Sequence, residues 1–271
     1  MSSKKRREED EEEQGQGSGT ARKQEGLYPL LLMILRMTKN SPYPFWYGET
    51  HAGCGRNRKV DCEGSPLTFG RAARDSGKKE INAAFCDINP VAIEELRKYA
   101  DVLPSDSLFF CQNNADFLLE LTCRIRAKEP NPKFAWGAIF CDPQKYRDFP
   151  IKALAEFMFE FRKIDLILNL NATLFQMFQG CKESLNGNVP VKHMDKPTRR
   201  ELIAMFHKKY WLVRNLVGKG HRFTLCYGTN NDKFFHEGKH FLDFYDINSV
   251  EGKMIFDALH NVNPDQLEFP F

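Results

Sequence analysis

The chain has 271 residues, of which 42% are hydrophobic and 28% charged, with a formal net charge of +3. This composition supports one sizeable folded core and excludes a wholly disordered chain or one with a strong overall charge. The first 25 residues carry six Lys/Arg against seven Asp/Glu and no aromatic or branched apolar side chain. Residues 1–25 are therefore predicted to be a disordered charged tail.

Short apolar runs alternate with amphipathic stretches after this tail. The predicted helices are 26–39, 65–75, 90–99, 117–128, 151–162, 198–208 and about 250–259. The predicted strands are 45–49, 81–87, 108–112, 136–141, 164–169, 211–217 and 222–227. The alternation favours a parallel sheet with helices on both faces, and the turn at 218–221 predicts a C-terminal antiparallel hairpin. Seven strands that end in such a hairpin are typical of the Rossmann-like methyltransferase fold.

Three successive strand-to-helix turns carry the features of a nucleoside-binding site. Gly53 and Gly55 follow Glu49 at the end of the first strand, Asp87 ends the second, and Asp116 follows the third. Glycines let the backbone approach a ligand, and a carboxylate after the second strand accepts hydrogen bonds from ribose hydroxyls. Asp116 could accept from an adenine amino group. The alternative for Asp87 and Asp116 is that each caps the helix after it.

Asp142 and Pro143 follow the fourth strand, where methyltransferases that act on exocyclic amines place an acceptor for the target amine. Asp142 is the candidate acceptor and Tyr146 the candidate stacking residue. An Asp-Pro turn that caps the next helix is the alternative. His51 is a secondary catalytic candidate, as a base beside the methyl donor, or else a substitute for a packed aromatic residue.

The order of these motifs resembles the three-Cys-motif partner proteins, which look like class I S-adenosylmethionine-dependent methyltransferases. The matching segments are 49–55 (ETHAGCG), 64–67 (GSPL), Asp87, Asp142-Pro143 and 165–169 (DLILN). The resemblance covers roughly residues 27–228 and departs from the family pattern at His51 and Gln144. It implies S-adenosylmethionine as cofactor and a three-Cys-motif protein as a possible partner.

A basic window follows the fifth strand. Residues 192–222 hold nine Lys/Arg against two acids, a local net charge of +7. Aromatic residues are interleaved with these charges, which is typical of surfaces that bind unpaired bases. The candidate nucleic-acid contacts are Arg56, Arg58, Lys59, Arg199, Arg200, Lys208, Lys209 and Arg222. The alternative is an ordinary solvated helix face, with Phe206 and Trp211 in the core.

These features together predict a methyltransferase that acts on DNA or RNA, in a domain spanning 26–230, with an acidic extension at 231–271. The alternative is a non-catalytic module of the same fold that binds a protein or a nucleic acid. A nicotinamide dehydrogenase is disfavoured by the hairpin and by the long loop after Gly55. The eight cysteines lack metal-like spacing, so no metal is expected. No secretory signal or membrane-length apolar run is present, which predicts a cytoplasmic protein without membrane contact.

Overall fold

The computed structural model describes residues 19–57, 61–143, 149–171, 199–218 and 221–257. Its helices are α2 (Gly19–Met37), α3 (Ser65–Ser76), α4 (Pro90–Arg97), α5 (Asn114–Lys128), α6 (Ile151–Glu160), α8 (Arg199–Ala204), α9 (Asp232–Phe241) and α10 (Val250–Asp257), with 3-10 turns η1 (Ala100–Val102) and η2 (Pro132–Phe134). Its strands are β1 (Phe45–Glu49), β2 (Arg56–Asn57), β3 (Cys62–Glu63), β4 (Ile81–Asp87), β5 (Leu108–Cys111), β6 (Trp136–Cys141), β7 (Ile164–Asn171), β8 (Tyr210–Gly218), β9 (His221–Thr229) and β10 (Tyr245–Asp246).

A central sheet has the strand order β10-β8-β9-β7-β6-β1-β4-β5. Strands β5, β4, β1, β6 and β7 pair in parallel, and β9 lies antiparallel between β7 and β8. The predicted α/β class and the antiparallel hairpin are confirmed. The sheet has eight strands where seven are predicted, because the two-residue strand β10 pairs with β8. A run of two residues carries no periodicity that could reveal a strand.

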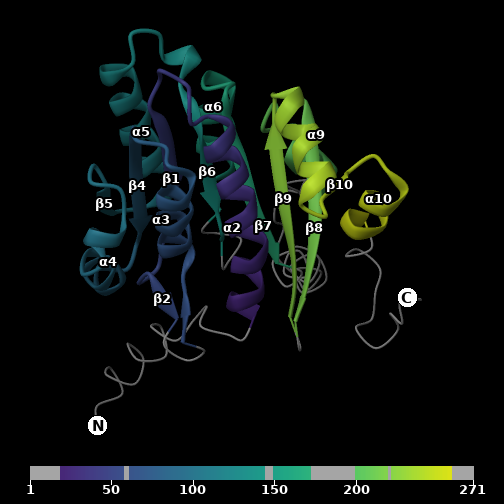
Figure 1. Ribbon diagram of the computed structural model, residues 1–271, viewed down its shortest axis with the longest axis horizontal. Coiled ribbons are helices and arrows are strands. Elements are labelled where there is room, and N and C mark those ends of the chain that lie inside the picture. Colours follow the sequence, from purple (N-terminus) through teal and green to yellow (C-terminus); the bar gives the residue numbers. More distant parts are fainter. Residues whose placement is uncertain (1–18, 58–60, 144–148, 172–198, 219–220, 258–271) are drawn as a thin grey trace, which may run out of the picture.

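Helices cover both faces of the sheet, and each face has its own core. One core combines α2, α3, α4 and α9, with Tyr47 stacked on Phe69 at a ring distance of 3.7 Å. The other combines α5, α6, α8 and α10, with Phe157 and Phe161 at 4.7 Å. Figure 1 shows α2 and α3 side by side in front of the strands. None of the helices in the described ranges is long and apolar enough to cross a membrane.

Helix α2 begins at Gly19, seven residues before the predicted start and inside the segment predicted to be a disordered tail. The cause is tertiary: Leu27, Leu30 and Leu31 are fully buried, and Lys23 and Gln24 of the same helix are also buried. The three buried leucines anchor the helix. Contacts nearer its start, such as the ion pair of Lys23 with Asp142, extend it toward Gly19. Residues 1–18 lie outside the described residues.

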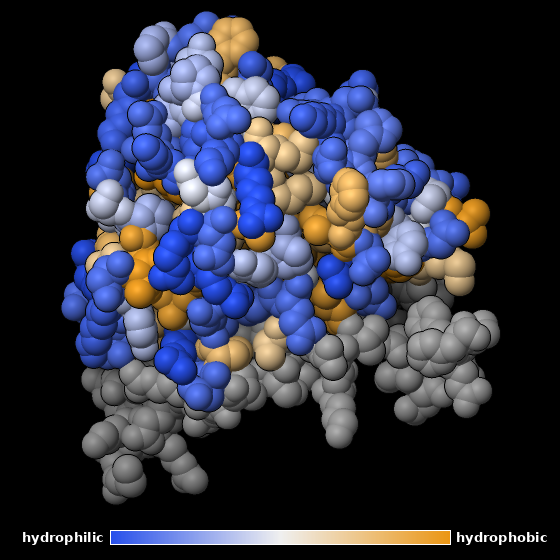
Figure 2. Space-filling model, viewed as in Figure 1, coloured by the Kyte–Doolittle hydropathy of each residue, from blue (hydrophilic) through white to orange (hydrophobic). Residues whose placement is uncertain are grey.

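Segment 231–257 packs against the sheet. Phe234 and Phe235 of α9 lie in the core shared with α2, and Phe256 of α10 lies in the opposite core. The face shown in Figure 2 is mainly hydrophilic where it is coloured, and its hydrophobic patches are separate from one another. Segment 231–257 is thus anchored in both cores by buried aromatic side chains.

Candidate functional site

The glycine turn after β1 is held in a conformation that favours glycine. Gly53 and Gly55 have φ values of 61° and 81°. A Cβ atom at Gly55 would lie 2.8 Å from Leu96 Cδ1, whereas one at Gly53 would meet no atom within 4 Å. Gly55 is therefore needed for packing, and Gly53 borders open space where a ligand can approach the backbone.

Asp87, at the end of β4, ties this turn to the next loop. Its Oδ2 accepts a hydrogen bond from Gly53 N and its Oδ1 accepts one from Asn89 N, both at 2.9 Å. The helix cap of α4 is Asn89, which accepts from Val91 N, so capping does not explain Asp87. A carboxylate offers about four acceptor positions, so two remain for the adjacent hydroxyls of a ribose. Asp87 is half-buried, which leaves it open to such a ligand.

His51 bridges the β1 turn and the start of α5. Its Nδ1 lies 2.7 Å from Thr50 Oγ1, and its Nε2 lies 2.8 Å from Asn114 Nδ2. Because an amide nitrogen can only donate, Nε2 accepts, and the neutral ring carries its proton on Nδ1. Both ring nitrogens are therefore engaged in holding two loops together. This arrangement favours a positioning role over that of a base.

Asp116 lies in the first turn of α5 and is exposed. The cap of α5 is Asn113, whose Oδ1 accepts from Ala115 N and Asp116 N at 3.1 and 2.9 Å. Asn113 Nδ2 also donates to Asp116 Oδ2. Asn113 and Asn114 precede Asp116, as the cap and the first residue of α5. Their amides were readable in the sequence as the residues directly after the strand.

Glu49 is fully buried beneath the turn. Its carboxyl group accepts hydrogen bonds from Ser65 Oγ and, at 3.1 Å, from Tyr47 Oη. Burial raises the pKa of Glu49 to about 8, and the nearby charge of Asp142 acts in the same direction, against the two hydrogen bonds and Lys23. Ser65 is thus occupied with Glu49, and the residue at the N-cap of α3 is Gly64. Glu49 supports the site from below, and its raised pKa favours the neutral form.

Asp142 follows β6 and is 6% exposed. Its Oδ1 accepts from Asn169 Nδ2 at 2.7 Å, and its Oδ2 forms an ion pair with Lys23 Nζ from α2. The predicted acceptor carboxylate thus already holds a primary ammonium group of the same chain. Sequence reasoning missed Lys23, because it lies in a charged segment without periodicity. Asn169 could have been found as the polar residue near the end of a buried strand. Tyr146 lies outside the described residues.

These groups meet at the carboxyl ends of the parallel strands. The chain leaves β1 toward β4 and β5 on one side and returns to β6 on the other, so the direction of winding reverses between β1 and β6. Ligands of open α/β sheets bind at such a switch point. Glu49 pairs in register with Phe140 of β6, and Thr50 N donates to Phe140 O at 3.1 Å, which brings Glu49 and Asp142 to the same place.

The predicted nucleic-acid contacts do not form one surface. Lys208 is buried, and its Nζ donates to the carbonyl oxygen of Ile164 at the amino end of β7. Lys208 and the exposed Lys209 therefore lie at the opposite end of the sheet from Asp142. Burial lowers the pKa of Lys208 to about 8. Phe206 and Trp211 belong to the core, as the alternative predicted.

Of the remaining basic candidates for nucleic-acid contact, the structure describes the side chains of Arg56 and Arg200. Arg56 is exposed next to the glycine turn, and its guanidinium lies 2.8 Å from Asp61 Oδ1. Arg200 donates to Ile247 O at 3.4 Å. Arg58 and Lys59 lie outside the described residues, as do the side chains of Arg199 and Arg222. Only Arg56 is thus seen at the edge that carries Asp87 and Asp142.

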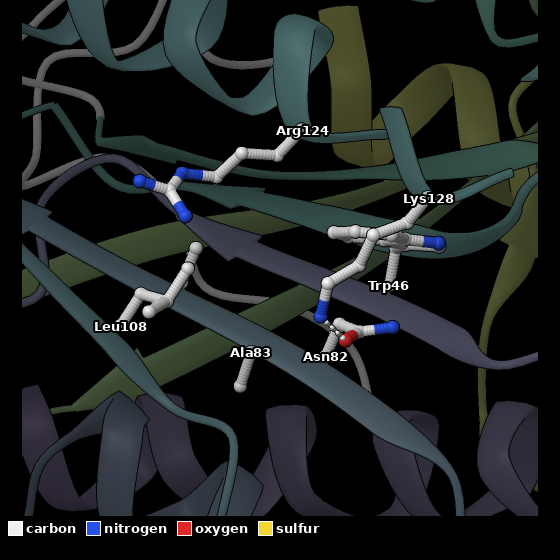
Figure 3. A pocket seen from close by; sticks show the side chains of 7 residues that line it. Trp46, Asn82, Ala83, Leu108, Arg124 and Lys128 are labelled. Atoms are coloured by element: carbon white, nitrogen blue, oxygen red, sulfur yellow. Dashed lines mark hydrogen bonds between the residues drawn. The ribbon is translucent and has the colours of Figure 1, made fainter. Parts of the chain in front are cut away.

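Two cavities lie away from this group of residues. The first, of about 20 Å³, lies near the amino ends of β1 and β4, where Lys128 Nζ donates to Asn82 Oδ1 at 2.9 Å beside Trp46 (Figure 3). It has room for about one water molecule and lies at the wrong end of the strands for a cofactor. The second, of about 330 Å³, lies between α2, β3 and α3. Within the described ranges no group of three or more His, Cys, Asp or Glu residues could hold a metal ion.

No protein-family model matches the chain, and no curated protein matches it. Among solved structures, it is similar to protein LPL1258 from Legionella pneumophila str. Philadelphia 1, with a TM-score of 0.50 and 14% identity over 90% of this chain and 92% of that one. It is also similar to a SAM-dependent methyltransferase from Agrobacterium tumefaciens, with a TM-score of 0.45 and 10% identity over 75% of this chain and 61% of that one. A third similar structure is magnesium protoporphyrin IX methyltransferase from Synechocystis PCC 6803 with bound SAH. Its TM-score is 0.43, with 10% identity over 77% of this chain and 84% of that one. The strand order, together with the likeness over nine-tenths of LPL1258, shows that the chain has the predicted Rossmann-like α/β fold, a mostly parallel sheet with a C-terminal antiparallel hairpin.

Proposed function

We propose that this protein is an S-adenosylmethionine-dependent methyltransferase that transfers a methyl group to an amine, with nucleic acid as the substrate class. The observation that carries the proposal is the position of Asp87. Its carboxylate joins two loops at the carboxyl ends of the strands and keeps acceptor positions for two ribose hydroxyls, beside the open backbone at Gly53. These residues fit the nucleoside part of the cofactor. Asp116 is exposed at the edge of this proposed site, and Glu49 is buried beneath it.

The acceptor side of the proposed site is built around Asp142. When bound, S-adenosylmethionine supplies a methyl group on a positively charged sulfur. Asp142 holds an amine through its carboxylate, as its contact with the Lys23 ammonium illustrates, and Asn169 fixes the orientation of that carboxylate. Asp142, in its ion pair with Lys23, is the acidic group at the switch point. The carboxylate would accept a hydrogen bond from the amine and align it, and the low exposure of Asp142 limits competition from water.

The nucleic-acid part of the proposal is supported by Arg56, a cation that is exposed at the edge of the site. A three-Cys-motif protein as partner and a cytoplasmic location remain expectations from the resemblance and the composition.

A second candidate function is favoured by the Lys23 ion pair. If Lys23 occupies Asp142 permanently, no target amine can reach it, and the fold would serve as a non-catalytic binding module. The two functions make different predictions for methyl transfer and the same prediction for cofactor binding.

Calorimetric titration with S-adenosylmethionine tests the cofactor site. Asp87→Asn keeps one acceptor for the loop N–H groups but removes the charge, so we expect at least a 10-fold loss of affinity. Asp106→Ala, an exposed acid before the amino end of β5, is the matched control and should bind as the unchanged chain does. Equal binding by Asp87→Asn, or no binding by the unchanged chain, would remove the cofactor assignment.

A further inference from the structure

Three cations gather at the amino-end edge of the sheet, away from Asp142. Arg162 and Lys163 lie in the turn between α6 and β7, and Lys209 directly precedes β8. Arg162 and Lys209 are exposed, and Lys163 is half-buried. Within the described ranges, none of the three forms an ion pair with an acidic side chain. Their charges are therefore available to an anion that approaches this edge.

The acids that lie beside these cations have other partners. Glu160 accepts hydrogen bonds from Arg126 Nε and Nη2 at 2.7 and 2.8 Å, in a bidentate pair. Asp232 accepts from Tyr210 Oη at 2.9 Å, and Lys209 Nζ lies over the Tyr210 ring, 4.6 Å from its centroid. Asp232 can offset one of the three charges at most, so the described part of this edge keeps a surplus of positive charge.

Two phenylalanine rings are exposed next to the cations. Phe159 is 58% exposed and Phe134 is 47% exposed. The Arg162 guanidinium lies over the Phe159 ring at 4.9 Å, and Lys163 Nζ lies over the Phe134 ring at 4.2 Å. Each cation covers part of its ring, and the rest of the ring faces solvent. An exposed ring beside a cation can stack on a base while the cation contacts a phosphate.

Asn230 holds the loops of this edge in place. Its Nδ2 donates to Arg162 O at 2.9 Å and to His207 O at 3.4 Å, and its Oδ1 accepts from Lys209 N at 2.7 Å. His207 has a φ of 54°, and its ring lies 5.2 Å from the Phe159 ring. One side chain thus joins three loops, so the cations and rings are arranged before any ligand binds, which lowers the entropic cost of binding.

Cations and exposed rings together favour a single-stranded nucleic acid. A duplex offers phosphates but keeps its base faces stacked, and an acidic peptide offers carboxylates without flat rings. We propose that the surface formed by Arg162, Lys163, Lys209, Phe134 and Phe159 binds single-stranded nucleic acid. This function goes beyond methyl transfer, because it does not depend on the cofactor. The six residues of β6 place this surface about 20 Å from the edge that carries Asp142.

Anisotropy titration of the full chain with a labelled oligothymidylate of about 12 nucleotides, at several salt concentrations, tests the proposal. Thymine has no exocyclic amine, so this probe does not present the group that the proposed acceptor site holds. The triple variant Arg162→Gln, Lys163→Gln, Lys209→Gln should bind at least 10-fold more weakly. Its salt slope should be smaller by about 2, since each lost phosphate contact removes about 0.7 for a single strand.

A matched triple variant controls for overall charge. Lys98→Gln, Lys239→Gln and Lys253→Gln change exposed lysines after α4, on α9 and on α10 by the same total charge. This control should bind as the unchanged chain does. Equal effects of the two triple variants, on affinity and on salt slope, would overturn the proposal.

The rings are tested separately from the charges. Phe134→Leu and Phe159→Leu keep an exposed apolar side chain but remove the ring, so each should lower affinity by about 5- to 150-fold and leave the salt slope unchanged. Phe241→Leu, at a position 69% exposed on α9, is the control and should have no effect. Binding of poly-glutamate as tight as that of the oligonucleotide, or no effect of the Phe134 and Phe159 changes, would indicate a surface for acidic proteins and overturn the proposal.

Two further variants separate this surface from the proposed methyl-transfer site. Oligothymidylate binding should survive Asp87→Asn and Asp142→Asn, with or without S-adenosylmethionine. Binding that is lost in these variants and kept in the triple variant at Arg162, Lys163 and Lys209 would place the nucleic acid at the other edge and overturn the proposal. Failure of S-adenosylmethionine to bind would overturn the proposed function and leave this surface standing.

Discussion

Replacement of Glu49 by Gln should stabilise the protein in a strongly pH-dependent way. Glu49 is completely buried, and its pKa is raised from 4.5 to about 8, mainly by burial. Between these two values the folded chain keeps a proton that the unfolded chain has released, so the free energy of unfolding falls as pH rises and levels off above pH 8. Gln has nearly the same shape and stays neutral at every pH, and its oxygen can accept from one of the Ser65 and Tyr47 hydroxyls while its NH2 group donates to the other.

The size of the effect follows from the pKa. Each pH unit between 5 and 8 is worth about 1.36 kcal/mol, so the advantage of Glu49→Gln over the unchanged chain should grow by about 4 kcal/mol from pH 5 to pH 9 at most, and we expect about 2–4 kcal/mol. Urea unfolding at several pH values measures the difference between the two chains, which cancels the titration of all other groups. Glu94→Gln, at an exposed position on α4, is the control and should show a constant difference. A difference for Glu49→Gln that does not change with pH would refute this account of Glu49.

Three further substitutions test other parts of the site. Lys23→Met leaves Asp142 buried without its cation and should lower the free energy of unfolding by about 3–5 kcal/mol. The double variant that also carries Asp142→Asn should regain most of this loss. A loss below about 1 kcal/mol for Lys23→Met would mean that the ion pair does not hold α2 in place. Gly55→Ala should lower the free energy of unfolding by about 2–4 kcal/mol and Gly53→Ala by about 1–2 kcal/mol. Both residues have a positive φ, but only the Cβ atom added at Gly55 would clash with Leu96. Equal losses would contradict the packing described at Gly55. Lys208→Met should leave nucleic-acid affinity and its salt dependence unchanged, because Lys208 is buried against Ile164 O; a salt slope smaller by about one would return Lys208 to the phosphate contacts.

The sheet could be predicted from the sequence because its strands are continuous apolar runs. β1, β4 and β6 begin and end at the predicted residues. The short strands β2, β3 and β10 could not be found, since each has two residues and depends on a neighbour. Helix α9 is absent from the predicted helices although its pattern is amphipathic, with Asn231 as its cap and Phe234, Phe235 and Gly238 on its buried face.

The candidate site was predictable as far as each residue follows a strand. Asp87 and Asp142 reach the same edge because parallel strands end there. Their partners depend on tertiary contacts: Lys23 lies 119 positions from Asp142, and the burial that keeps Glu49 protonated comes from packing. The basic window illustrates the same limit. Local net charge does not reveal that Lys208 turns inward or that β8 starts at the opposite edge of the sheet.

Transfer of labelled methyl groups from S-adenosylmethionine to separate pools of DNA, RNA and protein tests the central claim most directly. We expect label in a nucleic-acid pool, and we expect its loss in both Asp87→Asn and Asp142→Asn, with Asp106→Ala as active as the unchanged chain. No label in any pool from a chain that binds S-adenosylmethionine would contradict the claim and favour the non-catalytic module.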